Sequence, residues 1–221
     1  YNMKKLHHWN AWIGTDESGK GDYFGPLVVA GVYINNDCID TFVEMGISDG
    51  KKITNSRVEK LANWMWEHYE ENIVVIKKMP ETYNTDYDHF QSQGKNLNTL
   101  LASMHVEVIQ KLSESKGTEH VLVDKFSYHD IVTSQLRSEN MDVKLETKAE
   151  RDIAVAAASI IARATFLTDM DALSKEFDFE LPRGATPNVK VAARDFIRQH
   201  GVSALGNVAK LHFKTTKDVL Y

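Results

Sequence analysis

The segment at residues 14–26, which reads GTDESGKGDYFGP, constrains the fold most, because it separates two stretches that favour β-strands. Residues 8–13 lead into it, and the apolar, β-branched run 27–34 follows it. The segment itself carries two adjacent acids, a lysine between glycines and an aromatic pair. A strand that ends in carboxylates and continues into a glycine turn can hold acidic side chains in fixed positions at a sheet edge. This combination indicates metal-assisted chemistry on a phosphate.

Residues 14–20 also match the phosphate-binding pattern G-x-x-x-x-G-K. However, Gly21 stands where a nucleotide-binding P-loop has a hydroxyl for magnesium, and Asp16 and Glu17 would repel the phosphates. We therefore interpret the two acids as ligands of a divalent cation, which prefers oxygen ligands. On these residues alone, a solvated turn, in which aspartate is common, explains the pattern equally well.

The composition is that of one globular domain. The chain has 221 residues and no Pro-, Gly- or Ser-rich linker, so we expect a single domain over residues 1–221. A net charge of -5 argues against a chain that coats nucleic acid uniformly, but it permits a local basic patch. Cys38 is the single cysteine, and neither a signal segment nor a bilayer-spanning run is visible. We expect a cytoplasmic monomer that contacts no membrane.

Hydrophobic periodicity predicts the remaining elements. Further strands are expected at residues 72–78, 119–124 and 143–147. Ser56 is the expected N-cap of one helix, with Glu59 completing a capping box. Helices are expected at residues 36–46, 56–70, 97–115, 130–137, 149–176, 189–200 and 214–220. This order predicts an α/β fold with a mixed five-stranded sheet flanked by helices and a helical C-terminal region.

Two further acids lie where strands end. Asp124 closes the apolar run Val121-Leu122-Val123, and Glu150 lies between the last predicted strand and an alanine-rich helix. Asp124 could instead start a turn, and Glu150 could be a first-turn acid favoured by the helix dipole. Asp152 and Glu146 compete with Glu150 for a role as ligand.

An ordered series of short blocks runs through most of the chain: GTDESGKGDYFGPLVVAGV, DGKKIT, KNLN, VLVDKF, ETKAE, AAASIIAR, LPRGA and GNVAKLHFKTT. Together these blocks resemble type 2 ribonuclease H, most closely ribonuclease HIII. The resemblance implies a ribonuclease H fold and hydrolysis of the RNA strand of RNA/DNA hybrids with Mg²⁺ or Mn²⁺. It also implies a two-metal mechanism, with 5′-phosphate and 3′-hydroxyl products, at four acids: Asp16, Glu17, Asp124 and Glu150.

The resemblance also implies which residues bind substrate. The turn Gly19-Lys20-Gly21 matches a loop that reads the 2′-hydroxyl through backbone groups. Basic residues outnumber acids near the C-terminus, where Asp195 is the only acid between Arg183 and Lys217. A basic segment of this kind favours phosphate contact. The substrate-binding candidates are therefore Gly19, Lys20, Gly21, Lys51, Lys52, Lys148, Ser159, Lys210 and Lys214.

Two departures and two alternatives accompany this resemblance. Gly50 replaces the usual serine before Lys51 and Lys52, so a hydroxyl contact is not expected there. Members also carry an N-terminal domain resembling the TATA-binding protein, whereas few residues precede Asp16; we expect the catalytic domain alone, as a fragment or a naturally short member. Lys20 and Glu150 favour ribonuclease HIII. The alternatives are ribonuclease HII-like cleavage at single embedded ribonucleotides and a non-catalytic hybrid-binding module.

Overall fold

The computed structural model describes residues 6–48, 52–125 and 129–221, and it divides into two compact units. Unit 1 comprises Tyr1–Glu17, Val29–Ile76 and Leu97–Ala164. Unit 2 comprises Ser18–Val28, Lys77–Asn96 and Thr165–Tyr221. The single domain expected over residues 1–221 stays a prediction.

A five-stranded sheet forms the centre of unit 1, with the strand order β3-β2-β1-β4-β5. β1 and β4 are parallel neighbours, and so are β4 and β5. The inner strands are largely buried and apolar, as expected for strands covered on both faces. The predicted mixed five-stranded sheet is confirmed. Its strands are β1 (Ala11–Ser18), β2 (Leu27–Asn35), β3 (Ile73–Lys78), β4 (His120–Asp124) and β5 (Asp142–Glu146).

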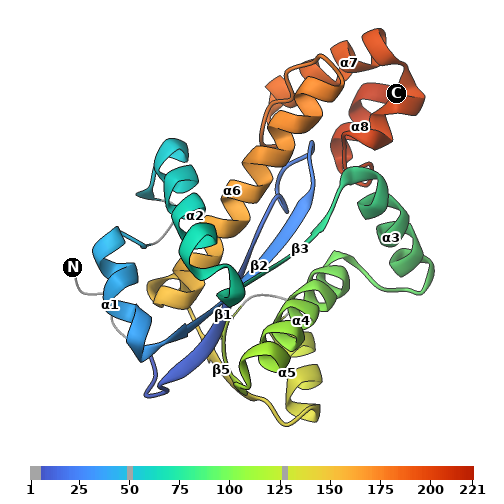
Figure 1. Cartoon of the computed structure of the whole chain (residues 1–221). Coiled ribbons are helices and arrows are strands. Elements are labelled where there is room, and N and C mark those ends of the chain that lie inside the picture. The colour runs from blue at the N-terminus through green and yellow to red at the C-terminus, as the bar shows by residue number, and fades with distance from the viewer. Residues whose placement is uncertain (1–5, 49–51, 126–128) are drawn as a thin grey trace. The chain divides into compact units, whose positions relative to one another are not determined.

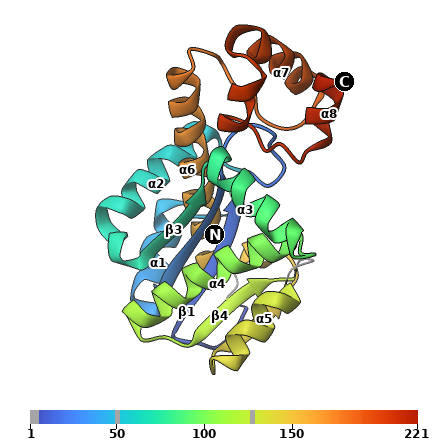
Figure 2. The ribbon, with the colours of Figure 1, turned by 90° about the vertical axis from the view of Figure 1, so that its right-hand side faces the viewer.

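Helices cover both faces of this sheet (Figure 1, Figure 2). One face is covered by α4 (Leu97–Lys116) and α5 (His129–Ser138). The first part of α6 (Ile153–Glu176) lies on the other face, on the same side as α1 (Asn36–Met45) and α2 (Asn55–Tyr69). The core of unit 1 therefore consists of two apolar layers, one on each side of the sheet.

Two glycines allow these layers to pack closely on β1 and β2. A Cβ at Gly14 would lie 2.5 Å from the backbone N of Val155 and 2.6 Å from the carbonyl C of Ala154, both at the start of α6. A Cβ at Gly31 would meet the Val108 side chain of α4. The alanine-rich sequence of α6 has the small side chains that such an approach needs. Gly14 thus brings α6 onto the strand that carries Asp16 and Glu17.

Unit 2 is mainly helical. Asn84 of α3 donates to the carbonyls of Gly206 at 3.0 Å and Ala209 at 2.9 Å, and Ala209 forms an isolated bridge with Phe24. These bonds tie α3 and the segment around Phe24 to the last 3-10 helix and to the residues that follow it. Its elements are α3 (Pro80–Ser92), the later part of α6, α7 (Pro187–His200), η4 (Val202–Asn207) and α8 (Lys214–Leu220).

The structure differs from the sequence prediction at several boundaries. β1 continues through Asp16 and Glu17 instead of ending before them. The N-cap of α2 is Thr54 and not Ser56, because Thr54 has extended backbone and its hydroxyl accepts from the N–H of Arg57 at 3.2 Å. Periodicity did not predict α3, which begins at Pro80. A separate 3-10 turn, η3 (Ala149–Arg151), precedes α6, so α6 begins later than expected.

Among the described residues, α6 is long and apolar enough by length and composition to cross a membrane. No such run was predicted from the sequence. However, 67% of the apolar window is buried inside the protein, as in the core helix of a globular fold. Burial inside the protein thus accounts for the apolar residues of α6.

We expect Gly14→Ala to lower the free energy of unfolding by about 1–3 kcal/mol, the usual cost of extra atoms in a packed core. The new Cβ would meet backbone atoms of α6, which cannot rotate away. Gly21→Ala is the matched control, because a Cβ there meets nothing within 4 Å and should change stability by less than about 0.5 kcal/mol. Urea denaturation measures both variants. Equal stabilities would contradict the close packing of α6 on β1.

Candidate active site

Asp16 and Asp124 lie in register on the neighbouring parallel strands β1 and β4. The parallel register of β1 and β4 pairs Ile13 with Val121 and Gly14 with Leu122. The same register, continued by two residues, sets Asp16 beside Asp124. Level residues on neighbouring parallel strands point to the same face of the sheet. The two aspartates, which are far apart in sequence, therefore come together at the carboxyl ends of the central strands.

The alternation of β1 directs its two adjacent acids to opposite faces of the sheet. Asp16 faces α6, where it forms a hydrogen bond with Ser159, and it also accepts the backbone N–H of Glu17 at 2.8 Å. Glu17 faces α4, where its Oε2 lies 3.3 Å from Nε2 of His105. The two carboxylates are thus anchored by different helices, although their side chains also form a hydrogen bond with each other at the strand end.

The electrostatics of this strand end disfavour negative charge. Burial raises the pKa of Asp16 well above its ordinary value, and the neighbouring charge of Glu17 raises it further. Burial also raises the pKa of Asp124, and the charges of Glu150 and Glu17 add to the increase. Backbone N–H groups of Lys125 and Ala149 partly oppose the shift at Asp124. A cation placed at these carboxylates would remove the penalty on their charge.

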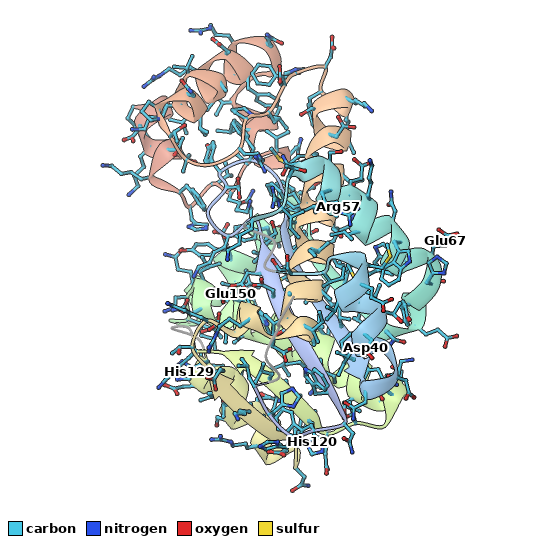
Figure 3. The ribbon with its side chains drawn as sticks, turned by 90° about the vertical axis from the view of Figure 1, so that its left-hand side faces the viewer. Asp40, Arg57, Glu67, His120, His129 and Glu150 are labelled. Atoms are coloured by element: carbon cyan, nitrogen blue, oxygen red, sulfur yellow. The ribbon has the colours of Figure 1, made fainter. Side chains whose placement is uncertain are left out.

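Glu150 and Asp152 have different environments, although both were candidates for the fourth acid. Glu150 lies in η3, beside the α6 ribbon, and its charge reaches Asp124 (Figure 3). Asp152 is fully buried. Its Oδ2 accepts from the indole N–H of Trp12 at 3.0 Å and from the N–H groups of Ala154 and Val155 at 2.9 and 3.2 Å. Asp152 therefore caps the start of α6.

Glu146, the other competitor, ends β5 and lies in register with Asp124. Its Oε1 is 3.4 Å from Nη2 of Arg151, so an arginine next to Glu150 balances part of its charge. Of the three acids in this region, Glu150 is the one whose charge acts on Asp124. This arrangement supports Glu150 as the fourth acid.

Ser159 and Lys148, both predicted to bind substrate, lie in the same unit as the acids. Ser159 is half-buried and forms its hydrogen bond with Asp16, so it holds a carboxylate in place. Lys148 is exposed and has left-handed backbone, with φ 51° and ψ 51°. Its side chain is available to solvent beside Glu150, and its role with substrate stays a prediction.

His105 was not predicted from the sequence. It is 3% exposed and lies on α4, with Nδ1 2.8 Å from the hydroxyl of Thr15 and Nε2 near Glu17. The sequence did contain a signal for this position. His105 lies four residues after Leu101 and four before Ile109, so it lies on the apolar face of the helix. A histidine on that face needs polar partners inside the protein, and β1 supplies them.

The glycine turn after β1 belongs to unit 2. Gly19 has φ 95°, a left-handed conformation in which a Cβ would clash with the carbonyl of Pro26, so the position requires glycine. The carbonyl of Gly19 accepts from the N–H of Asp22 at 3.2 Å, which closes the turn. Lys20 and Gly21 are exposed. The predicted reading of a 2′-hydroxyl by this turn is not tested.

Lys210 has a structural role that does not fit the predicted phosphate contact. It is fully buried, and its ammonium donates to the carbonyls of Asp22 at 2.7 Å and Gly25 at 2.6 Å. Burial lowers its pKa to about 7, against a smaller opposing effect of the Asp22 charge. A side chain enclosed in this way cannot reach a nucleic-acid backbone. Lys210 instead holds the loop that follows the glycine turn.

Among the other predicted lysines, two are described by the structure and one is not. Lys52 and Lys214 are exposed, which is compatible with phosphate contact. Lys51 lies outside the described residues. Part of the basic C-terminal segment is balanced within unit 2, because Lys190 pairs with Asp218 at 2.8 Å and Arg194 donates to the Asp218 carbonyl. The positive charge available to substrate is therefore smaller than the sequence count indicated.

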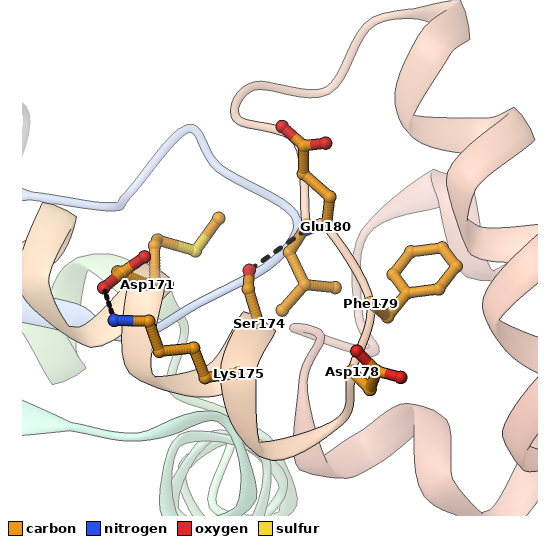
Figure 4. A pocket seen from close by; sticks show the side chains of 8 residues that line it. Asp171, Ser174, Lys175, Asp178, Phe179 and Glu180 are labelled. Carbon is orange, nitrogen blue, oxygen red and sulfur yellow. Dashed lines mark hydrogen bonds and ion pairs between the residues drawn. The ribbon is translucent and has the colours of Figure 1, made fainter.

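A hollow of about 540 Å³ lies in unit 2 at the end of α6 (Figure 4). Lys175 pairs there with Asp171 at 2.9 Å, and the hydroxyl of Ser174 accepts from the N–H of Leu181 at 3.2 Å. None of the predicted site residues lines this hollow. The candidate site therefore rests on the acids at the strand ends and not on the hollow.

Within the described residues, no three His, Cys, Asp or Glu side chains are grouped closely enough to hold a metal ion by themselves. This finding does not conflict with the chemistry of magnesium. Mg²⁺ is usually bound through one or two carboxylates together with waters and substrate phosphates. Asp16 and Asp124 supply such a pair of carboxylates.

Comparisons with known proteins agree with this geometry. The family model "Ribonuclease HII" matches residues 13–216. Ribonuclease HIII of Protochlamydia amoebophila (strain UWE25) is 39% identical over 210 residues, which cover 94% of this chain and 68% of the relative.

Solved structures show the same similarity. Bst-RNase HIII in complex with Mn²⁺ has a TM-score of 0.81 and 33% identity, over 95% of this chain and 69% of that chain. RNase HII of Archaeoglobus fulgidus, in its complex with PCNA, has a TM-score of 0.75 and 26% identity, over 95% of this chain and 97% of that chain. The fold and the resemblance predicted from the motifs are confirmed. The chain belongs to the ribonuclease HII family and is a ribonuclease H, similar over most of its length to relatives named Ribonuclease HIII.

Proposed function

We propose that this ribonuclease H is an endonuclease that hydrolyses the RNA strand of RNA/DNA hybrids with Mg²⁺ or Mn²⁺ and leaves 5′-phosphate and 3′-hydroxyl ends. The observation that carries the proposal is the level placement of Asp16 and Asp124 on β1 and β4. Glu17 and Glu150 add their charges to this pair. The Mn²⁺ complex of Bst-RNase HIII supports the choice of cation.

The donor set fits a hard divalent cation. All four acids offer carboxylate oxygens, the ligands that Mg²⁺ and Mn²⁺ prefer. Burial raises the pKa of Asp16 and of Asp124, and the charges of Glu17 and Glu150 add to the increase, so the protein holds negative charge at an energetic cost where a cation would offset it. Asp16 and Asp124 would be the central ligands of the cations. Glu17 and Glu150 would each add a further carboxylate.

The protein's own groups keep these carboxylates in position. The N–H of Glu17 and the hydroxyl of Ser159 hold Asp16, and the N–H groups of Lys125 and Ala149 hold Asp124. When bound, divalent cations would polarise the scissile phosphate and lower the pKa of the attacking water. Since backbone and α6 groups anchor the two aspartates, little reorganisation of the protein would accompany cation binding.

Substrate recognition is proposed for exposed groups. Lys52 and Lys148 in unit 1, and Lys20 and Lys214 in unit 2, are solvent-accessible cations that suit phosphate contact. The backbone of the glycine turn would read the 2′-hydroxyl, the group that distinguishes RNA from DNA. Cleavage at single embedded ribonucleotides is the alternative activity. Cytoplasmic location and a monomeric state stay predictions from composition.

Asp124→Asn and Asp16→Asn should each lower hybrid cleavage in Mg²⁺ by about 10³-fold or more, because several kcal/mol of transition-state stabilisation depend on a correctly held cation. Glu146→Gln is the matched control, since it removes a carboxylate in register with Asp124 but outside the proposed set. Single-turnover rates on a labelled hybrid measure all three. Near-normal cleavage by either aspartate variant would contradict the proposed site.

Substrate choice separates the two activities of the family. We expect Mg²⁺-dependent cleavage within runs of several ribonucleotides and little at one ribonucleotide embedded in duplex DNA, because a single 2′-hydroxyl gives the glycine turn only one contact. Two labelled duplexes, assayed in Mg²⁺ and then in Mn²⁺ with an EDTA control, provide the measurement. Efficient cleavage of the single-ribonucleotide duplex in Mg²⁺ would favour ribonuclease HII-like activity instead.

A further inference from the structure

A buried imidazole connects α4 to the acidic end of β1. His105 is 3% exposed and Thr15 is also 3% exposed, so their 2.8 Å contact lies inside the protein. On the other side of the ring, Nε2 lies 3.3 Å from Oε2 of Glu17, an oxygen that is itself buried. His105 therefore spans a hydroxyl and a carboxylate on one strand.

Side chains along β1 alternate between the two faces of the sheet, which explains how a single ring reaches both groups. Thr15 and Glu17 are two residues apart, so their side chains lie on the same face of the sheet, the face covered by α4. The intervening Asp16 points to the other face. One histidine on α4 can thus act on Glu17 without contacting the partner aspartate.

The hydrogen-bonding capacities of the three groups set the direction of the contacts. An ionised carboxylate only accepts, so the nitrogen that faces Glu17 must carry the proton. In the neutral ring Nδ1 then accepts, and the hydroxyl of Thr15 donates to it. Thr15 in this way fixes the tautomer and the orientation of the ring, which directs the N–H at Glu17.

The contact with Glu17 is longer than an ideal hydrogen bond. At 3.3 Å between Nε2 and Oε2 it exceeds the common N–H···O separation of about 2.9 Å, so its attraction is mainly electrostatic. It nevertheless places a ring nitrogen beside a buried carboxylate oxygen. The ring thereby restrains the Oε2 side of the Glu17 carboxylate.

We propose that His105 is a positioning residue that holds Glu17 for the divalent cation through the contacts Thr15–His105–Glu17. This inference rests on the proposed function, because it assigns Glu17 to the cation site. Partners that orient a metal-binding side chain commonly change metal affinity by about 10–100-fold when they are removed. His105 would act in this way from α4, a helix that carries none of the four acids.

Two substitutions separate positioning from simple filling of the core. In His105→Asn the shorter amide can replace only Nδ1, so it keeps the side facing Thr15 and loses the donor to Glu17. In His105→Gln the amide nitrogen reaches the position of Nε2 and restores that donor. His120→Gln is the matched control, since His120 contacts Asp142 at 3.0 Å at the start of β4, the other end of the strand from Asp124 (Figure 3).

The test is calorimetric titration of each variant of this chain with Mn²⁺ alone, which measures Mn²⁺ affinity. Urea denaturation in EDTA shows whether each variant is folded. We expect His105→Asn to weaken Mn²⁺ binding by about 10–100-fold, and His105→Gln and His120→Gln to stay within about three-fold of the parent. The Mn²⁺ concentration for half-maximal hybrid cleavage should rise in parallel, with kcat at saturating Mn²⁺ changed less. In a Glu17→Gln background, His105→Asn should weaken Mn²⁺ binding no further.

Unchanged Mn²⁺ affinity in a folded His105→Asn variant would overturn the proposal, as would equal losses in the Asn and Gln variants. If His105→Asn does not fold, Thr15→Val replaces it, because valine keeps the shape of threonine and removes the hydroxyl that orients the ring. Weaker Mn²⁺ binding in Thr15→Val then supports positioning, and parental affinity contradicts it. Failure of the parent to cleave hybrids would reject the proposed function while leaving the Mn²⁺ result to decide the role of His105.

Discussion

The parallel register between β1 and β4 is the constraint on which the site depends. It sets Asp16 level with Asp124, and Gly14 allows α6 to approach β1 closely enough for Ser159 to hold Asp16. The sheet hydrogen bonds and the packing of α6 thus keep two carboxylates together at one end of the sheet. Burial is the main cause of the raised pKa of each aspartate, and neighbouring glutamate charges add to it: that of Glu17 at Asp16, and those of Glu150 and Glu17 at Asp124.

Neighbouring acids in this protein have different roles because the backbone gives them different partners. Asp152 is buried, and its Oδ2 accepts from Trp12 and from two N–H groups at the start of α6, so it stabilises the helix end. Glu150, two residues earlier, keeps a charge that acts on Asp124. A cation ligand must be able to offer its carboxylate oxygens, and the buried helix cap of Asp152 separates it in this respect from Glu150.

Motifs and strand patterns predicted a large part of this arrangement from the sequence. The apolar run that ends at Asp124 and the acids at the end of β1 identified the correct strands, and the ordered blocks identified the family. Lys210 was misread, because sequence shows its charge but not the loop carbonyls that enclose it. His105 was missed for a similar reason. Its partners, Thr15 and Glu17, are 90 and 88 residues away and meet it only through tertiary packing.

The central claim is that the fold holds charge on Asp16 at an energetic cost that a cation offsets. Asp16→Asn should therefore be more stable than the parent near neutral pH in EDTA, because asparagine keeps the oxygen that accepts from Glu17 and removes the charge. A carboxyl whose folded pKa is raised above its ordinary value of 3.8 loses stability as the pH rises from that value through the folded pKa. The advantage of the variant should consequently disappear as the pH falls toward 3.8, and saturating Mn²⁺ should stabilise the parent more than the variant. The free energy of unfolding of both proteins across this pH range is the direct measurement. A variant that is less stable than the parent near neutral pH in EDTA would contradict the account.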